Sequence, residues 1–450
     1  MSYLKDFNWG TQEYKNSPIL KTIPFKPTPE QITNIKFRCE GLRDGLGLVN
    51  IVPNVQKSMA YIDLVHRLGI RNMTVGIYPG EGGAMDKYIQ KILKELNNNY
   101  PEITPLVLCL TMDKSIDWVL KCKEVNPRLE ALLFIGTSPS RMIAEDWDIK
   151  FVLDEIKKAF TRARKEDLNI IGATEHTTQT PPQFLERILK TQVEAGQEKL
   201  KSFIIADTIG CGTPLSVYRL TNFVLKTLKD LKAKHVEVEF HGHNDLDNAT
   251  ANNLVAIAAG ATYIHTVPRG YGERAGNTRL ESVLLNLTRI ADSNNIEHRW
   301  NLEYLDLLLR TYDKVLKIQS PQNGMMGLNA FRTGYGLHAA AMYKLSKKKD
   351  EAKREKKLKD VAAFQKMYAT VYSAIDPESV GRNHEIVVGP HIGINGIQLA
   401  AKLLNIKINK KQAFEVKKLI SYLNKPFTKE EFTDIIFTVE NGSNGNSKIK

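Results

Sequence analysis

Short β-branched or apolar runs alternate with longer amphipathic stretches from about residue 31 onward, and this alternation constrains the fold more than any other feature. The short runs predict strands, and the stretches between them have the length and polarity of surface helices. Eight strand–helix units in about 260 residues have the size of a (β/α)8 TIM barrel, an α/β fold. The predicted strands are Ile35–Cys39, Met73–Gly76, Leu106–Leu110, Leu132–Gly136, Ile170–Thr174, Ser202–Ala206, Val236–His243 and Tyr263–Val267.

Polar side chains gather directly after these strands. Arg43 and Asp44 follow the first strand, Glu175 follows the fifth, and His241 and His243 close the seventh. Barrel active sites are built from the C-terminal ends of the strands and the loops that follow them, so this clustering supports the barrel independently. The alternative is a doubly wound open sheet, but no Gly-rich dinucleotide fingerprint follows the first strand.

The pattern changes along the chain and predicts four segments. Residues 1–30 are polar and proline-spaced and form an N-terminal extension, and residues 31–300 form the barrel. Residues 301–435 form a mostly helical C-terminal region, and residues 436–450, rich in Asn, Gly and Ser, form a disordered tail. Helices of the C-terminal region are predicted at Asn301–Ile318, Asp360–Tyr372, Ile397–Leu404 and Lys411–Leu423.

The composition, 42% hydrophobic and 25% charged, is that of a globular protein. No stretch approaches the ~20 apolar residues of a spanning helix, and the N-terminus shows no signal-peptide pattern. We therefore expect a cytoplasmic protein with no membrane partner. The four cysteines have no zinc-type or CxxC spacing and fit a reducing compartment: Cys39, Cys109, Cys122 and Cys211.

A large part of the net charge of +13 sits in one basic run, residues 347–359. Basic runs can mark nucleic-acid contacts. Glutamates and an alanine are interleaved at helical spacing in this run, which favours a solvated helix instead. We expect no nucleic-acid partner. A positive field would also attract a polyanionic substrate such as a CoA ester.

Two histidines, His241 and His243, stand two residues apart on a predicted strand, so both rings point to the same side. The Gly-punctuated loop Gly270–Asn277 supplies a polar side chain after the next strand, and Asp44 lies upstream. Imidazole and oxygen donors in this arrangement suit a divalent metal with open coordination positions. A lone His-x-His pair is often only a surface or core feature, but the additional segments favour a catalytic metal site for Mn, Mg, Co or Zn.

These segments together resemble the metal-dependent Claisen-type acyltransferases. That family includes 2-isopropylmalate, homocitrate, citramalate and Re-citrate synthases, with 3-hydroxy-3-methylglutaryl-CoA lyase a more distant relative. The resemblance covers about residues 31–405 and rests on the Arg-Asp-Gly at Arg43, Asp207-Thr-Ile-Gly210, the His-x-His-Asn-Asp at His241 and the loop that ends at Asn277. It implies condensation of acetyl-CoA with a 2-oxo acid, followed by hydrolysis of the thioester.

The resemblance also implies roles for individual residues. Asp44, His241 and His243 match the metal ligands, with Asn277 nearby or as a fourth ligand. Arg43 matches the arginine that faces the keto oxygen, Thr208 a threonine that hydrogen-bonds the oxo acid's carboxylate, and Glu175 an active-site glutamate. His338 and Tyr372 resemble catalytic residues that a dimer partner inserts into the barrel mouth, so the resemblance implies an obligate homodimer.

Several positions depart from the family pattern. Gly47 stands where a glutamine is usual, and Thr74 stands at the end of the second strand, where a glutamate that braces the arginine is expected. His176 and Gln179 replace an aspartate and an arginine that often follow Glu175. These departures leave open a degenerate, non-catalytic homologue, although the metal-ligand types are intact.

The choice of oxo acid depends on Arg141. This residue resembles, with the register shifted by about one residue, an arginine with which homocitrate synthases hold a second carboxylate, and a guanidinium suits that task. It favours 2-oxoglutarate or oxaloacetate as substrate, hence a homocitrate or Re-citrate synthase. A surface arginine is the alternative, with a branched-chain oxo acid or pyruvate as substrate. A metal-dependent 3-hydroxyacyl-CoA lyase or aldolase also stays open, although the usual lyase cysteine is missing from the last barrel loop.

Overall fold

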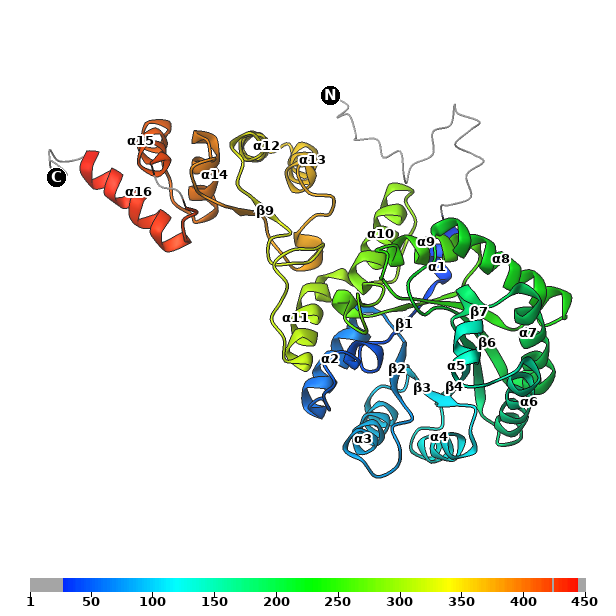
Figure 1. Ribbon diagram of the computed structural model, residues 1–450. Coiled ribbons are helices and arrows are strands. Elements are labelled where there is room, and N and C mark those ends of the chain that lie inside the picture. Colours follow the sequence, from blue (N-terminus) through cyan, green and yellow to red (C-terminus); the bar gives the residue numbers. More distant parts are fainter. Residues whose placement is uncertain (1–26, 423–424, 444–450) are drawn as a thin grey trace, which may run out of the picture. The chain divides into compact units, whose positions relative to one another are not determined.

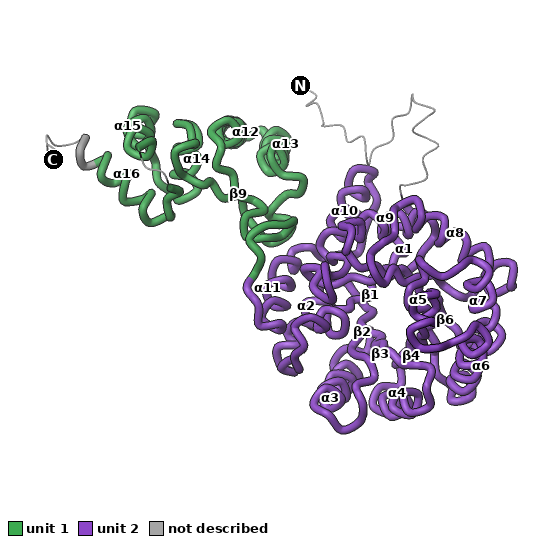
Figure 2. Tube along the Cα trace, viewed as in Figure 1, with its two compact units in different colours: residues 1–5, 320–450 green, residues 6–319 purple. Residues whose placement is uncertain are grey.

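A computed structural model describes residues 27–422 and 425–443 of the 450-residue chain. The described residues form two compact units, one up to Gln319 and one from Ser320 (Figure 2). The sequence analysis expected the barrel to end at residue 300. The compact unit includes one more helix, α11 (Leu305–Leu316), which packs on α2 (Val55–Leu68). No helix among the described residues is long and apolar enough to cross a membrane.

The first unit is built on a closed barrel of eight parallel strands (Figure 1). Each strand pairs with the next, and β1 also pairs with β8, which closes the sheet and excludes the open-sheet alternative. All eight predicted strands are present, so the predicted TIM barrel is confirmed. The strands are β1 (Lys36–Cys39), β2 (Asn72–Ile77), β3 (Thr104–Leu110), β4 (Glu130–Gly136), β5 (Asn169–Glu175), β6 (Leu200–Asp207), β7 (Glu237–Gly242) and β8 (Tyr263–Thr266).

Helices surround the barrel, and each buries one apolar stripe against it. In α6 (Ile149–Lys165), for example, Val152, Ile156 and Phe160 are buried at intervals of four residues, which places them on one face. The other helices of this unit are α1 (Pro29–Asn34), α3 (Ala84–Asn99), α4 (Asp113–Val125), α5 (Pro139–Ala144), α7 (Pro182–Gly196), α8 (Pro214–Asp230), α9 (Ala249–Ala259) and α10 (Leu280–Ser293).

The interior of the barrel is divided into an apolar side and a charged side. Strands β3 to β6 contribute a cluster of apolar side chains, Leu106, Leu108, Leu132, Ile171, Ala173 and Ile204. Strands β1, β7 and β8 contribute charged side chains at alternate positions. Because alternate side chains of a strand point to the same face, these charges line the inside while Phe37, Phe240 and Ile264 face the helices.

The charged side forms a continuous set of ion pairs that we call the charge column: Arg38, Glu40, Glu130, Glu239 and His265. Arg38 has no exposed surface and donates from Nε and Nη2 to both carboxylate oxygens of Glu239, at 2.9 and 3.0 Å. Its Nη1 donates to Glu130 at 3.0 Å. His265 lies between Glu239, 2.8 Å from Nε2, and Glu40, 2.9 Å from Nδ1. The column therefore alternates in charge along the barrel interior.

The second unit is helical, as expected, with one short parallel pair, β9 (Arg332–Thr333) and β10 (Glu385–Ile386). Its apolar core includes Ile397, Val416, Phe432 and Ile436. The basic run spans the end of α12 and the start of α13, so its prediction as helix holds apart from the turn that joins them. The helices are α12 (Gly336–Arg354), α13 (Leu358–Thr370), α14 (Ile394–Leu403), α15 (Lys410–Ser421) and α16 (Lys429–Ser443).

The ends of the chain differ in part from the predicted extension and tail. Residues 1–26 of the predicted extension lie outside the described residues, and α1 begins at Pro29. The prediction of disorder from residue 436 is wrong for its first part, because α16 continues to Ser443. Ile436 is fully buried in the apolar core of this unit, which accounts for the helix. Residues 444–450 lie outside the described residues.

The charge column makes a stability prediction. Replacing Arg38 by Met would leave Glu239 and Glu130 without their guanidinium, and we expect a loss of about 3–5 kcal/mol in the free energy of unfolding. Lys36 provides a matched control, because it lies on the same strand and pairs with Glu237 at 3.0 Å, but both side chains are more than a third exposed. Lys36→Met should cost at most about 1 kcal/mol in urea unfolding. Equal losses in the two variants would contradict the role of the column.

Candidate metal centre

The C-terminal end of β7 brings two imidazoles next to a carboxylate from β1. His241 and His243 lie on the same side of the strand end, and a short 3-10 turn (Asp44–Leu46) after β1 places Asp44 beside them. The Nε2 atoms of the two histidines are 3.4 Å apart, and they lie 3.3 and 3.7 Å from Asp44 Oδ2. All three residues are at most 8% exposed.

These distances fit a shared divalent cation. Two ligand atoms that each lie ~2.1 Å from an ion are ~3.0 Å apart in octahedral and ~3.4 Å apart in tetrahedral coordination. Two imidazole nitrogens and one carboxylate oxygen leave further positions open, as a catalytic centre requires. The structure thus brings together the three residues that the sequence singled out, and their donor atoms fit a metal ion.

Asn277 supplies a further oxygen next to these ligands. It faces His243 across an isolated antiparallel bridge, and its Nδ2 donates to the carbonyl of Tyr271 at 3.1 Å. The Oδ1 atom is buried and has no hydrogen-bond partner among the described residues. A side chain at Gly272 would strike the Asn277 amide at 2.1 Å, and the backbone there has φ of +146°. Glycine at this position therefore lets the loop fold over the site.

The electrostatics favour the metal-binding forms of His243 and Asp44. Burial and the neighbouring ring of His241 lower the pKa of His243 to about 4, so this imidazole is neutral at pH 7. Burial alone would raise the pKa of Asp44, but Arg43 and the two histidines lower it below its usual range. A neutral imidazole and an ionised carboxylate are the forms that ligate a cation.

Arg43 is held by two carboxylates beside this centre. Its Nε donates to Glu40 at 2.8 Å, and its Nη1 donates to Asp44 at 2.9 Å. Glu40 is fully buried, and burial alone would raise its pKa, but Arg43 and His265 lower it. The bracing glutamate that the sequence analysis expected at Thr74 is thus replaced by Glu40, from the end of β1.

Thr74 completes the brace rather than leaving a gap. Its hydroxyl, from the middle of β2, donates at 2.6 Å to Glu40 Oε1, just after the end of β1. The sequence analysis gave Glu40 no role. The available signal was the alternation of Arg38 and Glu40 with apolar residues on β1, which places both inside the barrel.

A second group of possible ligands, Glu40, His241 and His265, lies next to the first. Here the polar atoms already have partners. Glu40 Oε1 lies against Thr74 and His265, and its Oε2 accepts from Arg43. His265 lies between two carboxylates and fits an imidazolium in an ion-pair network. Asp44, His241 and His243 are therefore the better candidate set for a metal ion.

Loops after β6, β7 and β8 hold Thr208 at the same end of the barrel. Asp207 Oδ1 accepts from the backbone N–H groups of Cys211 and Gly212, both at 3.1 Å, and this fixes the turn after β6. Arg274 donates to both oxygens of Asp245 and to the carbonyl of Thr208. Thr208 Oγ1 accepts from the backbone N–H of His176 at 2.8 Å, which leaves its own proton free to donate.

Glu175 and Arg141, which the sequence treated separately, pair with each other. Arg141 Nε lies 3.3 Å from Glu175 Oε2, and Arg141 also pairs with Glu145. Glu175 ends β5, which is opposite β1 in the closed order of strands. Two of the positions that depart from the family pattern can be located. Gln179 is exposed. A Cβ added at Gly47, where a glutamine is usual, would lie 3.1 Å from the Glu273 carboxylate, so Glu273 lies beside this position.

His338 and Tyr372 belong to the second unit, where they form one aromatic group. Their rings stack with centroids 3.9 Å apart and an angle of 23° between planes. Tyr335 lies 6.1 Å from His338 and stacks on His391 at 5.8 Å. Tyr335 and Tyr372 are exposed, so this unit carries a solvent-facing group of phenol and imidazole side chains.

Comparison with known proteins identifies the family of this chain. Over 412 residues the chain is 27% identical to homocitrate synthase AksA of Methanocaldococcus jannaschii, covering 90% of this chain and 91% of that protein. It is 27% identical to a probable 2-isopropylmalate synthase of Methanopyrus kandleri, over 85% of this chain and 68% of that one. Among solved structures, hydroxymethylglutaryl-CoA lyase of Pseudomonas aeruginosa matches with a TM-score of 0.54 and 17% identity, over 66% of this chain and 95% of that chain, which supports the barrel fold. Residues 34–308 match the HMGL-like family model, and the chain belongs to the HMGL-like family.

Proposed function

We propose that this protein is an acyltransferase that condenses acetyl-CoA with a 2-oxo acid and hydrolyses the resulting thioester, releasing CoA. The observation that carries the proposal is the cluster of Asp44, His241 and His243 beside Arg43 at the C-terminal end of the barrel. The similarity to homocitrate and isopropylmalate synthases supports it. When bound there, a divalent cation such as Mn²⁺, Mg²⁺, Co²⁺ or Zn²⁺ would polarise the ketone of the oxo acid.

Arg43 stabilises the negative charge that develops on the keto oxygen as the acetyl carbon attacks. The guanidinium has five N–H donors, and the contacts with Glu40 and Asp44 leave some of them free. The side chain is 17% exposed, so it is reachable from the barrel mouth. Because Glu40 and Asp44 fix its position before substrate binds, its donors need little reorganisation in the transition state.

Thr208 and Arg141 hold the oxo acid's carboxylates. The free hydroxyl proton of Thr208 donates to the carboxylate next to the ketone. Arg141 is about one-third exposed, and its forked guanidinium donates hydrogen bonds to a second, distal carboxylate of the oxo acid. A dicarboxylic oxo acid, 2-oxoglutarate or oxaloacetate, satisfies both residues.

Glu175, His338 and Tyr372 move the protons. A base must remove a proton from the acetyl methyl group, and Glu175 is placed at the mouth of the barrel by β5. We assign His338 and Tyr372, stacked on each other in the second unit, to the same proton transfer in a homodimer whose partner subunit supplies them. The contact with Arg141 Nε, 3.3 Å from Glu175 Oε2, holds this carboxylate in position.

The proposed reaction predicts metal-dependent release of CoA. The protein with Mn²⁺ or Mg²⁺ should release free thiol from acetyl-CoA with at least one of 2-oxoglutarate, oxaloacetate, 2-oxoisovalerate, pyruvate and glyoxylate. His241→Ala should abolish this release and weaken metal binding measured by calorimetry, because it removes one of three ligands. If protein that is shown to bind the metal releases no thiol with any of these oxo acids, the acetyl-CoA reaction is contradicted.

The brace of Arg43 predicts an exchange experiment. Glu40→Thr should lower kcat about 100-fold, because Arg43 loses a carboxylate that orients it. Adding Thr74→Glu should restore most of that loss, because the two side chains touch and the acid would return from the neighbouring strand. Thr74→Ser, which keeps the hydroxyl, should leave kcat nearly unchanged. A Glu40→Thr enzyme with full activity, or a double variant no better than Glu40→Thr, would show that Glu40 does not position Arg43.

Arg141 predicts a substrate-dependent effect. Arg141→Gln should raise KM for a dicarboxylic oxo acid by about tenfold or more, because a charge-assisted contact is lost. It should change KM for a monocarboxylic oxo acid such as pyruvate far less. Lys150, an exposed lysine that pairs with Asp154 on the surface of α6, offers a control charge removal as Lys150→Gln. Equal effects on both classes of oxo acid would contradict recognition of a distal carboxylate.

A further inference from the structure

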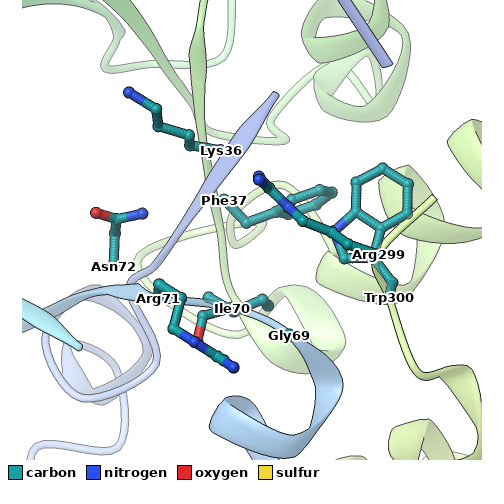
Figure 3. A pocket seen from close by; sticks show the side chains of 8 residues that line it. All are labelled: Lys36, Phe37, Gly69, Ile70, Arg71, Asn72, Arg299 and Trp300. Carbon is teal, nitrogen blue, oxygen red and sulfur yellow. The ribbon is translucent and has the colours of Figure 1, made fainter. Parts of the chain in front are cut away.

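A cavity of about 340 Å³ lies at the N-terminal end of the barrel strands β1 and β2 (Figure 3). Lys36 begins β1 and Asn72 begins β2, whereas Asp44 and the metal centre follow the opposite ends of the strands. In a parallel barrel these are opposite faces. The cavity is therefore separate from the proposed active site. Its lining residues are Lys36, Phe37, Gly69, Ile70, Arg71, Asn72, Arg299 and Trp300.

The charged side chains that line this cavity are all cationic. Lys36 is paired with Glu237, because its Nζ lies 3.0 Å from both carboxylate oxygens of that residue. Arg71 and Arg299 differ, because within residues 27–422 and 425–443 no carboxylate lies within ion-pair distance of either. Burial and the nearby guanidinium of Arg71 lower the pKa of Arg299. Two like charges thus share one cavity without a counter-charge.

Both arginines keep free donors. Among the described residues, Arg71 donates only from Nη1, to the carbonyls of His66 and Ile70 at and just after the C-terminal end of α2. Within the same residues, Arg299 donates only from Nη2, to the carbonyl of Ile35. A guanidinium has five N–H donors, so most of those on both residues have no partner in the described part of the chain. Glu102 interacts electrostatically with Arg71, but its carboxylate is exposed and paired with His66.

Two further features shape the cavity as a binding site. The side-chain amide of Asn72 makes no hydrogen bond to any residue in the described part of the chain. Figure 3 shows this side chain among the lining residues. Gly69 has φ of +99° and lets the backbone of Arg299 approach closely, since a Cβ on Gly69 would lie 2.8 Å from the Arg299 carbonyl oxygen. The buried Phe37 and Trp300 rings, 5.4 Å apart and edge to face, form the apolar part of the lining.

We propose that this cavity binds a compact oxyanion, a phosphate group or the carboxylates of a small organic acid, between Arg71 and Arg299. Forked guanidinium donors match the geometry of both kinds of oxyanion, and Asn72 adds a neutral donor. The anion supplies the counter-charge that the two arginines lack. Because the cavity lies at the opposite end of the barrel from Asp44, its ligand acts on the folded protein and not as a substrate.

The test measures the melting temperature of the full chain, treated with a chelator, against increasing sodium phosphate. Sodium malonate forms a second arm, and sodium chloride of equal ionic strength is the reference. A ligand that binds only the folded state raises the melting temperature saturably. We expect phosphate or malonate to do so beyond the effect of chloride. The larger response distinguishes a phosphate compound from a dicarboxylate as the natural ligand.

Variants locate the response. Arg299→Gln should weaken the apparent affinity about tenfold, the size of one lost charge-assisted contact. Asn72→Asp should abolish the response, because it supplies a carboxylate inside the cavity. It leaves intact the hydrogen bonds of Arg71 to the carbonyls of His66 and Ile70. Arg219→Gln, which removes an exposed arginine of α8, should respond like the unaltered protein. The proposal is overturned if neither anion exceeds chloride, or if Arg299→Gln and Asn72→Asp respond like Arg219→Gln.

Discussion

The bidentate pair between Arg38 and Glu239 is the interaction on which the organisation of the barrel depends. Both side chains are fully buried, and burial of two charges is tolerated only when they are paired and hydrogen-bonded. The pair aligns His265, His265 lies against Glu40, and Glu40 holds Arg43 next to the proposed metal ligands. Arg43 is thus the partly exposed end of an ion-pair network that begins deep in the barrel.

The division of the interior explains why this network is compatible with folding. Strands β3 to β6 supply the apolar packing that drives collapse, and the charge column draws on β1, β7 and β8 together with Glu130 at the start of β4. Strands β1, β7 and β8 are neighbours in the closed order, so most of these charges find partners on an adjacent or next strand, whereas Glu130 reaches Arg38 from β4. The same three strands end at the proposed metal centre, so the ion-pair network lies next to it.

Much of this architecture was predictable from the sequence because the signals are local. Alternation of apolar runs located all eight strands, and the two-residue spacing of His241 and His243 placed both rings on one face. The role of Glu40 was not predictable from spacing, since Thr74 and His265 are far away in the chain and meet it only through strand register. The extent of the barrel unit was missed for the same reason, because Tyr312 of α11 donates to the carbonyl of Gly41, 271 residues earlier.

The charge column also restricts how this barrel can change during evolution. A single substitution at Arg38 leaves the buried carboxylate of Glu239 without its guanidinium, and a single substitution at Glu239 leaves the buried Arg38 with Glu130 as its remaining carboxylate. Either intermediate is unstable, so the two positions can be exchanged for apolar residues only together, and His265 must follow because it shares the Glu239 carboxylate. Drift in this half of the interior therefore proceeds in coupled steps, whereas the apolar half can accept one volume-conserving replacement at a time.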